Sequence, residues 1–126
     1  MKNPSFKSIN TILYCQKWSE TVAFYRDVLK LEVNFASDWF IEFRVGETAF
    51  VSVADERRAT IKSGAGAGLT ITLQVEEIES AWHYLRRQGL EPGPIKEHAW
   101  SALVFYFYDP EGHRLELWSF KRGTGR

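Results

Sequence analysis

The stretch DPEGHRLELW, residues 109–118, decides most about the fold of this chain. Its Asp-Pro-Glu-Gly start is typical of a tight turn, because proline presets one backbone dihedral angle and glycine tolerates a positive φ. The turn joins an aromatic run, residues 103–108, to a strand whose side chains alternate between two faces. One face carries Leu115 and Leu117, and the other carries Arg114, Glu116 and Trp118. A carboxylate beside a tryptophan on one face indicates a binding site as well as a core.

The composition favours a small globular domain and disfavours a protein that binds nucleic acid or an anionic membrane. A chain of 126 residues suits one compact domain with a real hydrophobic core. The 16 basic and 16 acidic residues cancel, so nothing attracts the chain over a long range to nucleic acid or to an anionic membrane. Aromatic residues make up 15% of the chain, and such a surplus indicates a pocket or an interface.

Cysteine content and hydropathy indicate the cellular compartment in which the protein is expected. Cys15 is the only cysteine, so no intrachain disulfide can form and a reducing compartment is expected. Residues 1–18 contain no long apolar run, because Asn10, Gln16 and Lys17 interrupt it. We therefore expect a cytoplasmic protein without a membrane segment.

The chain divides into two halves with the same order of elements. In the first half residues 9–15 predict a strand, and Ser19 is a candidate N-cap for a helix with an apolar stripe. Three further strands are predicted over residues 31–35, 39–44 and 48–54. Residues 55–68 are polar and then rich in glycine and alanine, which indicates a linker.

The second half repeats this order. Residues 69–75 predict a strand and residues 76–88 a helix, whose apolar side chains recur at i, i+3, i+4 and i+7. Strands are predicted over residues 90–95, 101–108 and 113–120. Residues 84–91 also parallel residues 25–32 position by position, both leading from helix into strand. Such a period predicts two copies of one structural unit.

The predicted fold class is therefore α+β, with two β-α-β-β-β modules in a single domain, residues 1–126. The modules cover about residues 8–54 and 69–120, the linker is 55–68, and residues 121–126 are a flexible tail. Each helix covers one face of its sheet and leaves the other face bare. Two bare faces related by a pseudo-twofold axis would enclose a cleft, the default place for a binding site.

Two segments resemble a known superfamily. Residues 19–33 read SETVAFYRDVLKLEV and follow its "FYrdvLG" motif, with Lys30 in place of the usual glycine. Residues 107–117 carry Asp-Pro-Glu-Gly and Glu116 at the spacing of its "DPdG…iEL" motif. The chain thus resembles the vicinal oxygen chelate superfamily, which includes glyoxalase I, bleomycin-resistance proteins and extradiol dioxygenases. The resemblance implies paired modules, a pseudo-twofold axis and a homodimer.

The resemblance also implies where a divalent metal would bind. The four metal-binding positions of the superfamily correspond here to Asn10, Ser52, Thr70 and Glu116. Only Glu116 is a strong ligand, since histidines and carboxylates usually hold such metals. We expect no metal and no other cofactor; a displaced site that uses His98 with Glu116 is the alternative. His83 and His113 are interpreted as surface or capping residues.

Strand alternation predicts the side chains that face the cleft. Phe105 and Phe107 are expected to face the helix of their module. The predicted ligand-binding residues are aromatic or carry hydroxyl, amide or carboxylate groups, and they are Asn10, Tyr14, Phe50, Ser52, Thr70, Thr72, Trp100, Tyr106, Glu116 and Trp118. This set suits a flat, partly apolar ligand, with Glu116 meeting a cationic group or serving as the candidate catalytic base.

Other chemistries are disfavoured. Residues 64–68, GAGAG, do not form a dinucleotide-binding loop, because Leu69 occupies the third glycine position. Cys15 has no histidine at a recognisable spacing, and the aromatic residues lack the interleaved lysines and arginines of nucleic-acid binding proteins. Cys15 is therefore interpreted as a small buried residue.

The sequence and the resemblance lead to a functional prediction. The first hypothesis is a metal-independent binder of a small aromatic or amphipathic molecule in the cleft, with drug sequestration as a possible role. The first alternative is an enzyme, a glyoxalase-like lyase or a dioxygenase, that uses a displaced metal or Glu116 as base. The second is a regulatory or assembly module whose own side chains fill the cleft. We expect binding rather than catalysis.

Overall fold

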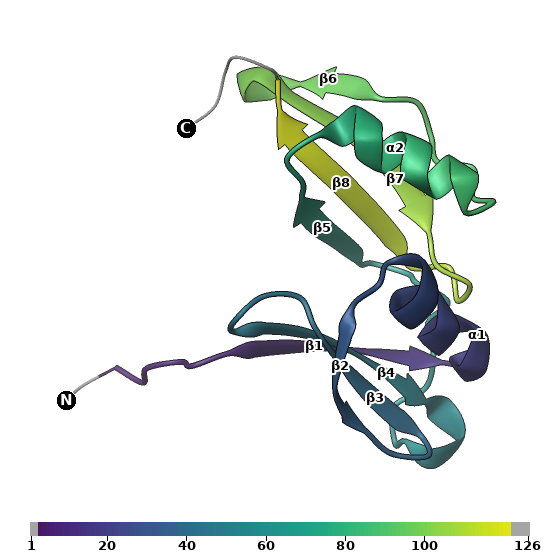
Figure 1. Cartoon of the computed structure of the whole chain (residues 1–126). Helices are drawn as coiled ribbons and strands as arrows, with labels where there is room; N and C mark the ends of the chain where they lie inside the picture. The colour runs from purple at the N-terminus through teal and green to yellow at the C-terminus, as the bar shows by residue number, and fades with distance from the viewer. Residues whose placement is uncertain (1–2, 122–126) are drawn as a thin grey trace. The chain divides into compact units, whose positions relative to one another are not determined.

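The computed structural model describes residues 3–121 as two compact units, Met1–Ala65 and Gly66–Arg126 (Figure 1). The boundary falls inside the predicted linker, residues 55–68. Each unit contains a four-stranded sheet, in the order β1-β4-β3-β2 in the first and β5-β8-β7-β6 in the second. The predicted repeat and the α+β fold class are thus confirmed. The predicted tail lies outside the described residues except for Lys121.

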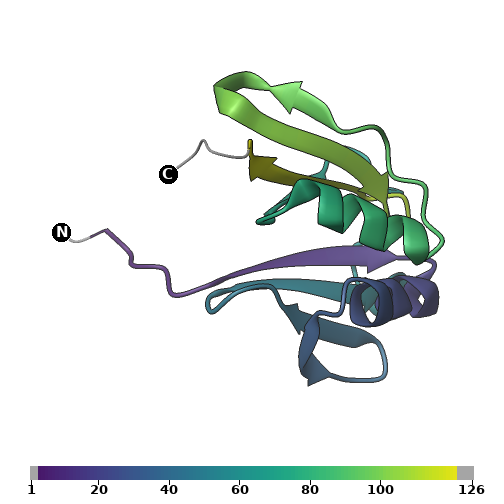
Figure 2. The ribbon, with the colours of Figure 1, turned by 45° about the horizontal axis from the view of Figure 1, so that its top comes forward.

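The first unit has one sheet, one helical segment and a short 3₁₀ turn. Its elements are β1 (Ile9–Cys15), α1 (Trp18–Ala23), the π-helical turn η1 (Phe24–Val28), β2 (Glu32–Ala36), β3 (Phe40–Arg44), β4 (Ala49–Asp55) and the 3₁₀ turn η2 (Glu56–Arg58). β1 and β4 run parallel side by side, as Figure 2 shows, whereas the other pairs are antiparallel. The strands lie within one residue of the predicted ranges.

The helix of the first unit begins differently from the prediction. Ser19 is not the N-cap, because α1 starts at Trp18 and its N-cap is Lys17. No side chain caps this end; instead the Thr21 hydroxyl donates a hydrogen bond of 2.6 Å back to the Lys17 carbonyl. A threonine one turn into a helix can make this bond with the carbonyl four residues earlier.

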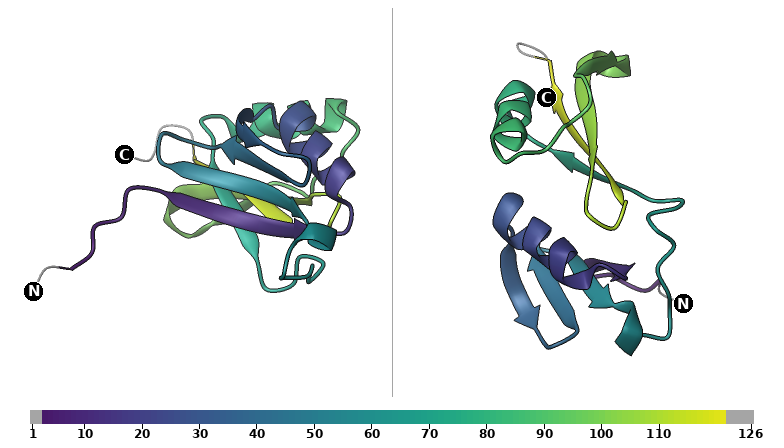
Figure 3. Two further views of the ribbon diagram at one scale, coloured as in Figure 1. Left: turned by 90° about the horizontal axis from the view of Figure 1, so that it is seen from below. Right: turned by 90° about the vertical axis from the view of Figure 1, so that its right-hand side faces the viewer.

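α1 packs on the face of the sheet formed by β1 and β4 (Figure 3). Tyr25, Phe43 and Val53 are buried there, and Cys15 is fully buried, as expected. The Trp18 indole donates a hydrogen bond of 2.9 Å to the Val53 carbonyl. This bond fixes the start of the helix to the central strand β4.

The second unit has the same plan with a longer helix. Its elements are β5 (Thr70–Gln74), α2 (Ile78–Arg87), β6 (Lys96–His98), the turn η3 (Ala99–Ser101), β7 (Ala102–Tyr108) and β8 (Arg114–Phe120). The predicted strand over 90–95 is wrong, since the strand before β7 is Lys96–His98. Pro92 and Pro94 lack the backbone N–H that a strand inside a sheet donates.

α2 packs on one face of β7 and β8, which leaves the opposite face of this sheet without a helix (Figures 1 and 3). Leu115 and Leu117 of β8, and Phe105 and Phe107 of β7, are buried. The remaining side chains of both strands alternate onto the opposite face, as the sequence predicts. We call the surface opposite α2, formed by β5, β8, β7 and β6, the open face.

The turn before β8 is held by one carboxylate. Asp109 Oδ1 accepts hydrogen bonds of 3.0, 3.0 and 2.9 Å from the backbone N–H groups of Glu111, Gly112 and His113. Asp109 Oδ2 lies 2.8 Å from His113 Nδ1, and both side chains are buried. His113 was predicted to be a surface or capping residue; because it is buried, the surface alternative is wrong.

No helix among residues 3–121 is long and apolar enough to cross a membrane.

Candidate functional site

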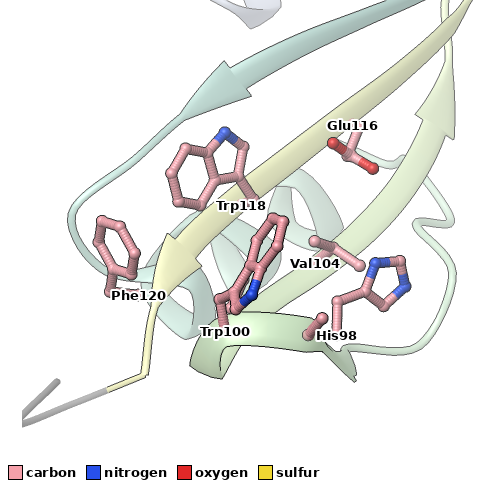
Figure 4. Close-up of a pocket in the computed structure, with 8 residues that line it drawn as sticks. His98, Trp100, Val104, Glu116, Trp118 and Phe120 are labelled. Atoms are coloured by element: carbon pink, nitrogen blue, oxygen red, sulfur yellow. The ribbon is translucent and has the colours of Figure 1, made fainter. Parts of the chain in front are cut away.

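The open face of the second unit contains a pocket of about 760 Å³ (Figure 4). Its lining combines aromatic and small apolar side chains with one carboxylate and one imidazole, and consists of His98, Ala99, Trp100, Ala102, Val104, Glu116, Trp118 and Phe120. A lining of four aromatic or heteroaromatic rings and a single acidic group is chemically suited to a flat, partly apolar molecule.

The strand register brings these side chains together. β7 pairs antiparallel with β8, so that Val104 lies opposite Trp118 and Ala102 lies opposite Phe120. β6 continues the row, because His98 pairs with Ala102. Side chains of directly paired residues share a face of the sheet, and the three strands therefore contribute one continuous surface.

Trp100 completes the pocket from outside the sheet. It lies in η3 with a φ of 63°, in the left-handed region, and its side chain is 91% exposed. Figure 4 shows its indole projecting into the pocket, on the same side as Trp118 and His98. Trp118 and Phe120 meet edge to face, with ring centroids 5.1 Å apart. The pocket thus has aromatic side chains from a rigid strand and from the β6–β7 connection.

Glu116 is the only carboxylate among the lining residues of this pocket. Hydrogen bonding to Glu116 is the largest cause that raises the pKa of the neighbouring Tyr106, followed by burial. In the sheet Glu116 lies opposite Tyr106 on one side and Thr72 on the other. The carboxylate that lines the pocket therefore has a phenol as its direct neighbour on β7.

Arg114 lies on the same face of β8, two residues before Glu116. Its Cζ atom is 4.5 Å from the centroid of the Tyr106 ring, and its Nε donates a hydrogen bond of 3.0 Å to Thr70 Oγ1. With Thr70 it lines a second pocket of about 400 Å³, which the glycine-rich turn and Tyr108 complete. The main chains are very close here, since a Cβ atom on Gly66 would lie 2.1 Å from the Gly112 carbonyl oxygen.

The first unit carries a polar network on the face of its sheet opposite α1. The Ser52 hydroxyl is fully buried and donates a 2.8 Å hydrogen bond to Asn10 Oδ1. Asn10 Nδ2 then donates to Glu42 at 3.1 Å, and Asn34 Nδ2 donates to the other oxygen of Glu42 at 2.5 Å. Arg44 extends the network by donating to Asn34 Oδ1 at 2.7 Å. We call these five residues the Glu42 network.

The predicted site residues fall into two groups. Four of them, Asn10, Tyr14, Phe50 and Ser52, lie in the first unit, on the face opposite α1. The other six lie in the second unit, and three of these, Trp100, Glu116 and Trp118, line the larger pocket. The remaining three adjoin it or the smaller pocket: Tyr106 and Thr72 beside Glu116, and Thr70 beside Arg114.

Three residues of the site regions were not among the predicted site residues. Phe120 shares the face of Glu116 and Trp118, and the same alternation identifies it. For His98 the sequence predicts only a role in a displaced metal site. Glu42 lies opposite Ser52 in the sheet; the alternation within residues 39–44 predicts its face only once the pairing of that strand is known.

The donor set at the four superfamily metal positions does not fit a divalent cation. In the first unit Asn10 and Ser52 are neutral and bonded to each other. In the second unit the positive guanidinium of Arg114 lies 3.0 Å from the Thr70 oxygen. Among residues 3–121, no group of three or more histidines, cysteines or carboxylates is arranged to hold a metal ion.

The chain is similar to known proteins along most of its length. A sequence profile of the Glyoxalase/Bleomycin resistance protein/Dioxygenase superfamily matches residues 8–117. The uncharacterized protein YraH of Bacillus subtilis (strain 168) is 23% identical over 124 residues, which cover 89% of this chain and 97% of that protein.

Two solved structures share the fold. A glyoxalase/bleomycin resistance protein/dioxygenase from Nocardioides has a TM-score of 0.77 at 18% identity, covering 100% of this chain and 91% of its own. Lactoylglutathione lyase from Agrobacterium tumefaciens has a TM-score of 0.75 at 20% identity, covering 94% of this chain and 96% of its own. The TM-scores establish the shared fold, and at identities this low the likeness concerns the fold alone.

Proposed function

The chain belongs to the Glyoxalase/Bleomycin resistance protein/Dioxygenase superfamily, and we propose that it binds a small aromatic or amphipathic molecule without a metal ion. The proposed site is the 760 Å³ pocket on the open face of the second unit. Sequestration of such a molecule, as in drug resistance, is the role we propose for it.

The observation that carries this proposal is the combination of aromatic rings with a single oriented carboxylate. Trp118 and Phe120 form a fixed apolar floor, and Trp100 supplies a further indole from the β6–β7 connection. Aromatic pairs prefer offset or edge-to-face contacts, which add about 0.5–1.5 kcal/mol beyond the buried area. Glu116 adds a site for a ligand amine, because an ionised carboxylate makes stronger hydrogen bonds than a neutral acceptor.

The residues at the metal positions support metal independence. Ser52 and Asn10 satisfy each other, and Thr70 accepts from a cation. A divalent ion at either place would have to break these hydrogen bonds and, beside Arg114, to approach a positive charge. We therefore propose that Glu116 contacts the ligand directly.

Tryptamine is the probe for this proposal, since it combines an indole ring with a primary amine. Protein dialysed against a chelator is titrated with tryptamine by calorimetry, and the dissociation constant, Kd, is measured for wild type and variants. We expect saturable binding that weakens at least several-fold in Trp118→Ala and in Glu116→Gln. The matched controls are Trp39→Ala in the first unit and Glu79→Gln on α2, which should leave the Kd unchanged.

Two results would overturn the proposal. One is the absence of saturable binding of tryptamine to folded, metal-free protein. The other is binding that weakens equally in the controls and in the pocket variants, because the indole would then bind somewhere else. Thermal denaturation of each variant verifies that it is folded before the titration.

A further inference from the structure

Strand β8 places three different kinds of group in a row on the open face. Trp118 is followed by Glu116 and then by Arg114, each two residues from the next. Alternate residues of a strand lie about 7 Å apart. The row therefore runs from an aromatic ring to a negative charge and then to a positive charge over about 14 Å.

The two charges of this row do not neutralise each other. Tyr106 lies between them: it pairs with Glu116 in the sheet, and the centroid of its ring is 4.5 Å from the Cζ atom of Arg114. Within the described part of the chain Arg114 makes no ion pair with a carboxylate. Each charge is therefore positioned by neutral neighbours and remains available to a ligand of opposite sign.

Arg114 also faces open space. It lines the smaller pocket, of about 400 Å³, together with Thr70 and Tyr108. Only its Nε is used in the hydrogen bond to Thr70, so the two terminal nitrogens of the fork have no partner among residues 3–121. A guanidinium held at Nε and over a ring presents its remaining donors in a fixed direction, which suits a carboxylate or a phosphate.

We propose that the ligand is a zwitterion whose aromatic ring, amine and anionic group follow one another in that order. The ring binds at Trp118, the amine at Glu116 and the anion at Arg114. This inference rests on the proposed function, because it uses the same aromatic pocket, and adds the smaller pocket as the anion subsite. An amine and an anion separated by about two residues of extended chain, as at the two ends of a dipeptide, match the spacing of about 7 Å between the two protein charges.

Tryptophyl-glycine is the simplest probe with this order of groups. Its Kd is compared by calorimetry with that of tryptophyl-glycinamide, which lacks only the anion, and of glycyl-tryptophan, in which the ring lies beside the anion. We expect tryptophyl-glycine to bind about 2- to 5-fold more tightly than either, the upper part of the range of one exposed ion pair. This preference should be lost in Arg114→Gln and kept in Arg87→Gln, whose side chain lies in the last turn of α2.

The outcomes separate this inference from the function on which it rests. Equal affinities for tryptophyl-glycine and its amide, with tryptamine still bound, would overturn the zwitterion and leave the aromatic site. Loss of tryptamine binding as well would overturn both. If Arg114→Gln does not fold, the comparison of tryptophyl-glycine with its amide on wild-type protein still tests the anion subsite, because the two peptides differ there only in charge. Arg114→Lys, which keeps the positive charge, should then keep part of the preference.

Discussion

Lys30 adopts a backbone conformation that glycine would adopt more easily. Its φ is 60°, and it directly follows Leu29, the C-cap of the helical segment that ends at Val28. Gly89, at the matching position of the second half, has a φ of 88°. A left-handed conformation costs an ordinary residue about 1–2 kcal/mol, whereas glycine adopts it without a steric penalty. The superfamily's usual glycine therefore has a physical reason here.

Replacing Lys30 by glycine is expected to raise the free energy of unfolding. The relief of backbone strain exceeds the extra entropy of glycine in the unfolded chain, which leaves a net gain of about 0.5–1 kcal/mol. Urea denaturation of Lys30→Gly measures it, with Gly89→Lys as the opposite change, which should lose about 1 kcal/mol. A destabilised Lys30→Gly would mean that the lysine side chain contributes more than its exposure indicates.

The interaction between Tyr106 and Glu116 leads to a second prediction, which concerns how the stability of the fold depends on pH. The carboxylate stabilises the protonated phenol, so the pKa of Tyr106 in the folded protein lies above its ordinary value. Its contribution to stability is complete below about pH 10, where an unfolded tyrosine ionises, and is lost as the pH rises through the higher folded pKa.

Glu116→Gln is expected to lower the pKa of Tyr106, because the charge that favours the phenol is removed. The ultraviolet absorbance of tyrosinate, followed during an alkaline titration of wild type and variant, measures the shift. Tyr106→Phe identifies which part of the signal belongs to this residue. An unchanged titration in Glu116→Gln would show that the carboxylate is not bonded to the phenol.

At the scale of the elements, the connection into β5 depends on close contact between two main chains. Gly66 has a φ of 84° and lies against Gly112, so that an added Cβ would be 2.1 Å from a carbonyl oxygen. Gly68 has a φ of 74°, but a Cβ there would meet nothing within 4 Å. The two glycines therefore separate backbone strain from steric overlap.

Gly68→Ala is expected to cost about 1–2 kcal/mol, because it introduces backbone strain alone. Gly66→Ala adds the overlap with the turn before β8 and is expected to cost a further 1–3 kcal/mol or so. Chemical denaturation of both variants gives the difference. Equal losses would indicate that the turn moves away at no cost, and the glycine at position 66 would then be needed only for its φ.

The elements also show what could be predicted from the sequence. The faces of β8 follow from the alternation of Leu115, Glu116, Leu117 and Trp118, since period two is a local property. The strand before β7 was misplaced because its own residues, Lys96–His98, carry no apolar pattern and only pairing with β7 makes them a strand. The pocket needed this pairing too, because His98 reaches it only through β6.

At the scale of the whole molecule, two units of one fold present different surfaces opposite their helices. In the first unit the side chains of the Glu42 network are hydrogen-bonded to one another, and they include the fully buried hydroxyl of Ser52. In the second unit the corresponding face holds a pocket and two charges that are not paired with each other. The repeat is predictable from the period of the sequence, whereas this division depends on side-chain bonds across strands that no local pattern reveals.

This difference between the sheet faces of the two units leads to a prediction about metal ions. A ligand that binds only the folded state raises the melting temperature, Tm, by an amount that grows with the logarithm of its concentration divided by its Kd. Because Ser52, Asn10 and Thr70 are engaged in hydrogen bonds, Zn²⁺, Mn²⁺ or Ni²⁺ added to chelator-treated protein is expected to leave the Tm unchanged, whereas tryptamine should raise it. Elemental analysis of protein purified without chelator provides the independent check. About one metal ion per chain, lost together with the stabilisation in Glu116→Gln, would show that Glu116 is a metal ligand and that the aromatic pocket serves a metal-dependent reaction.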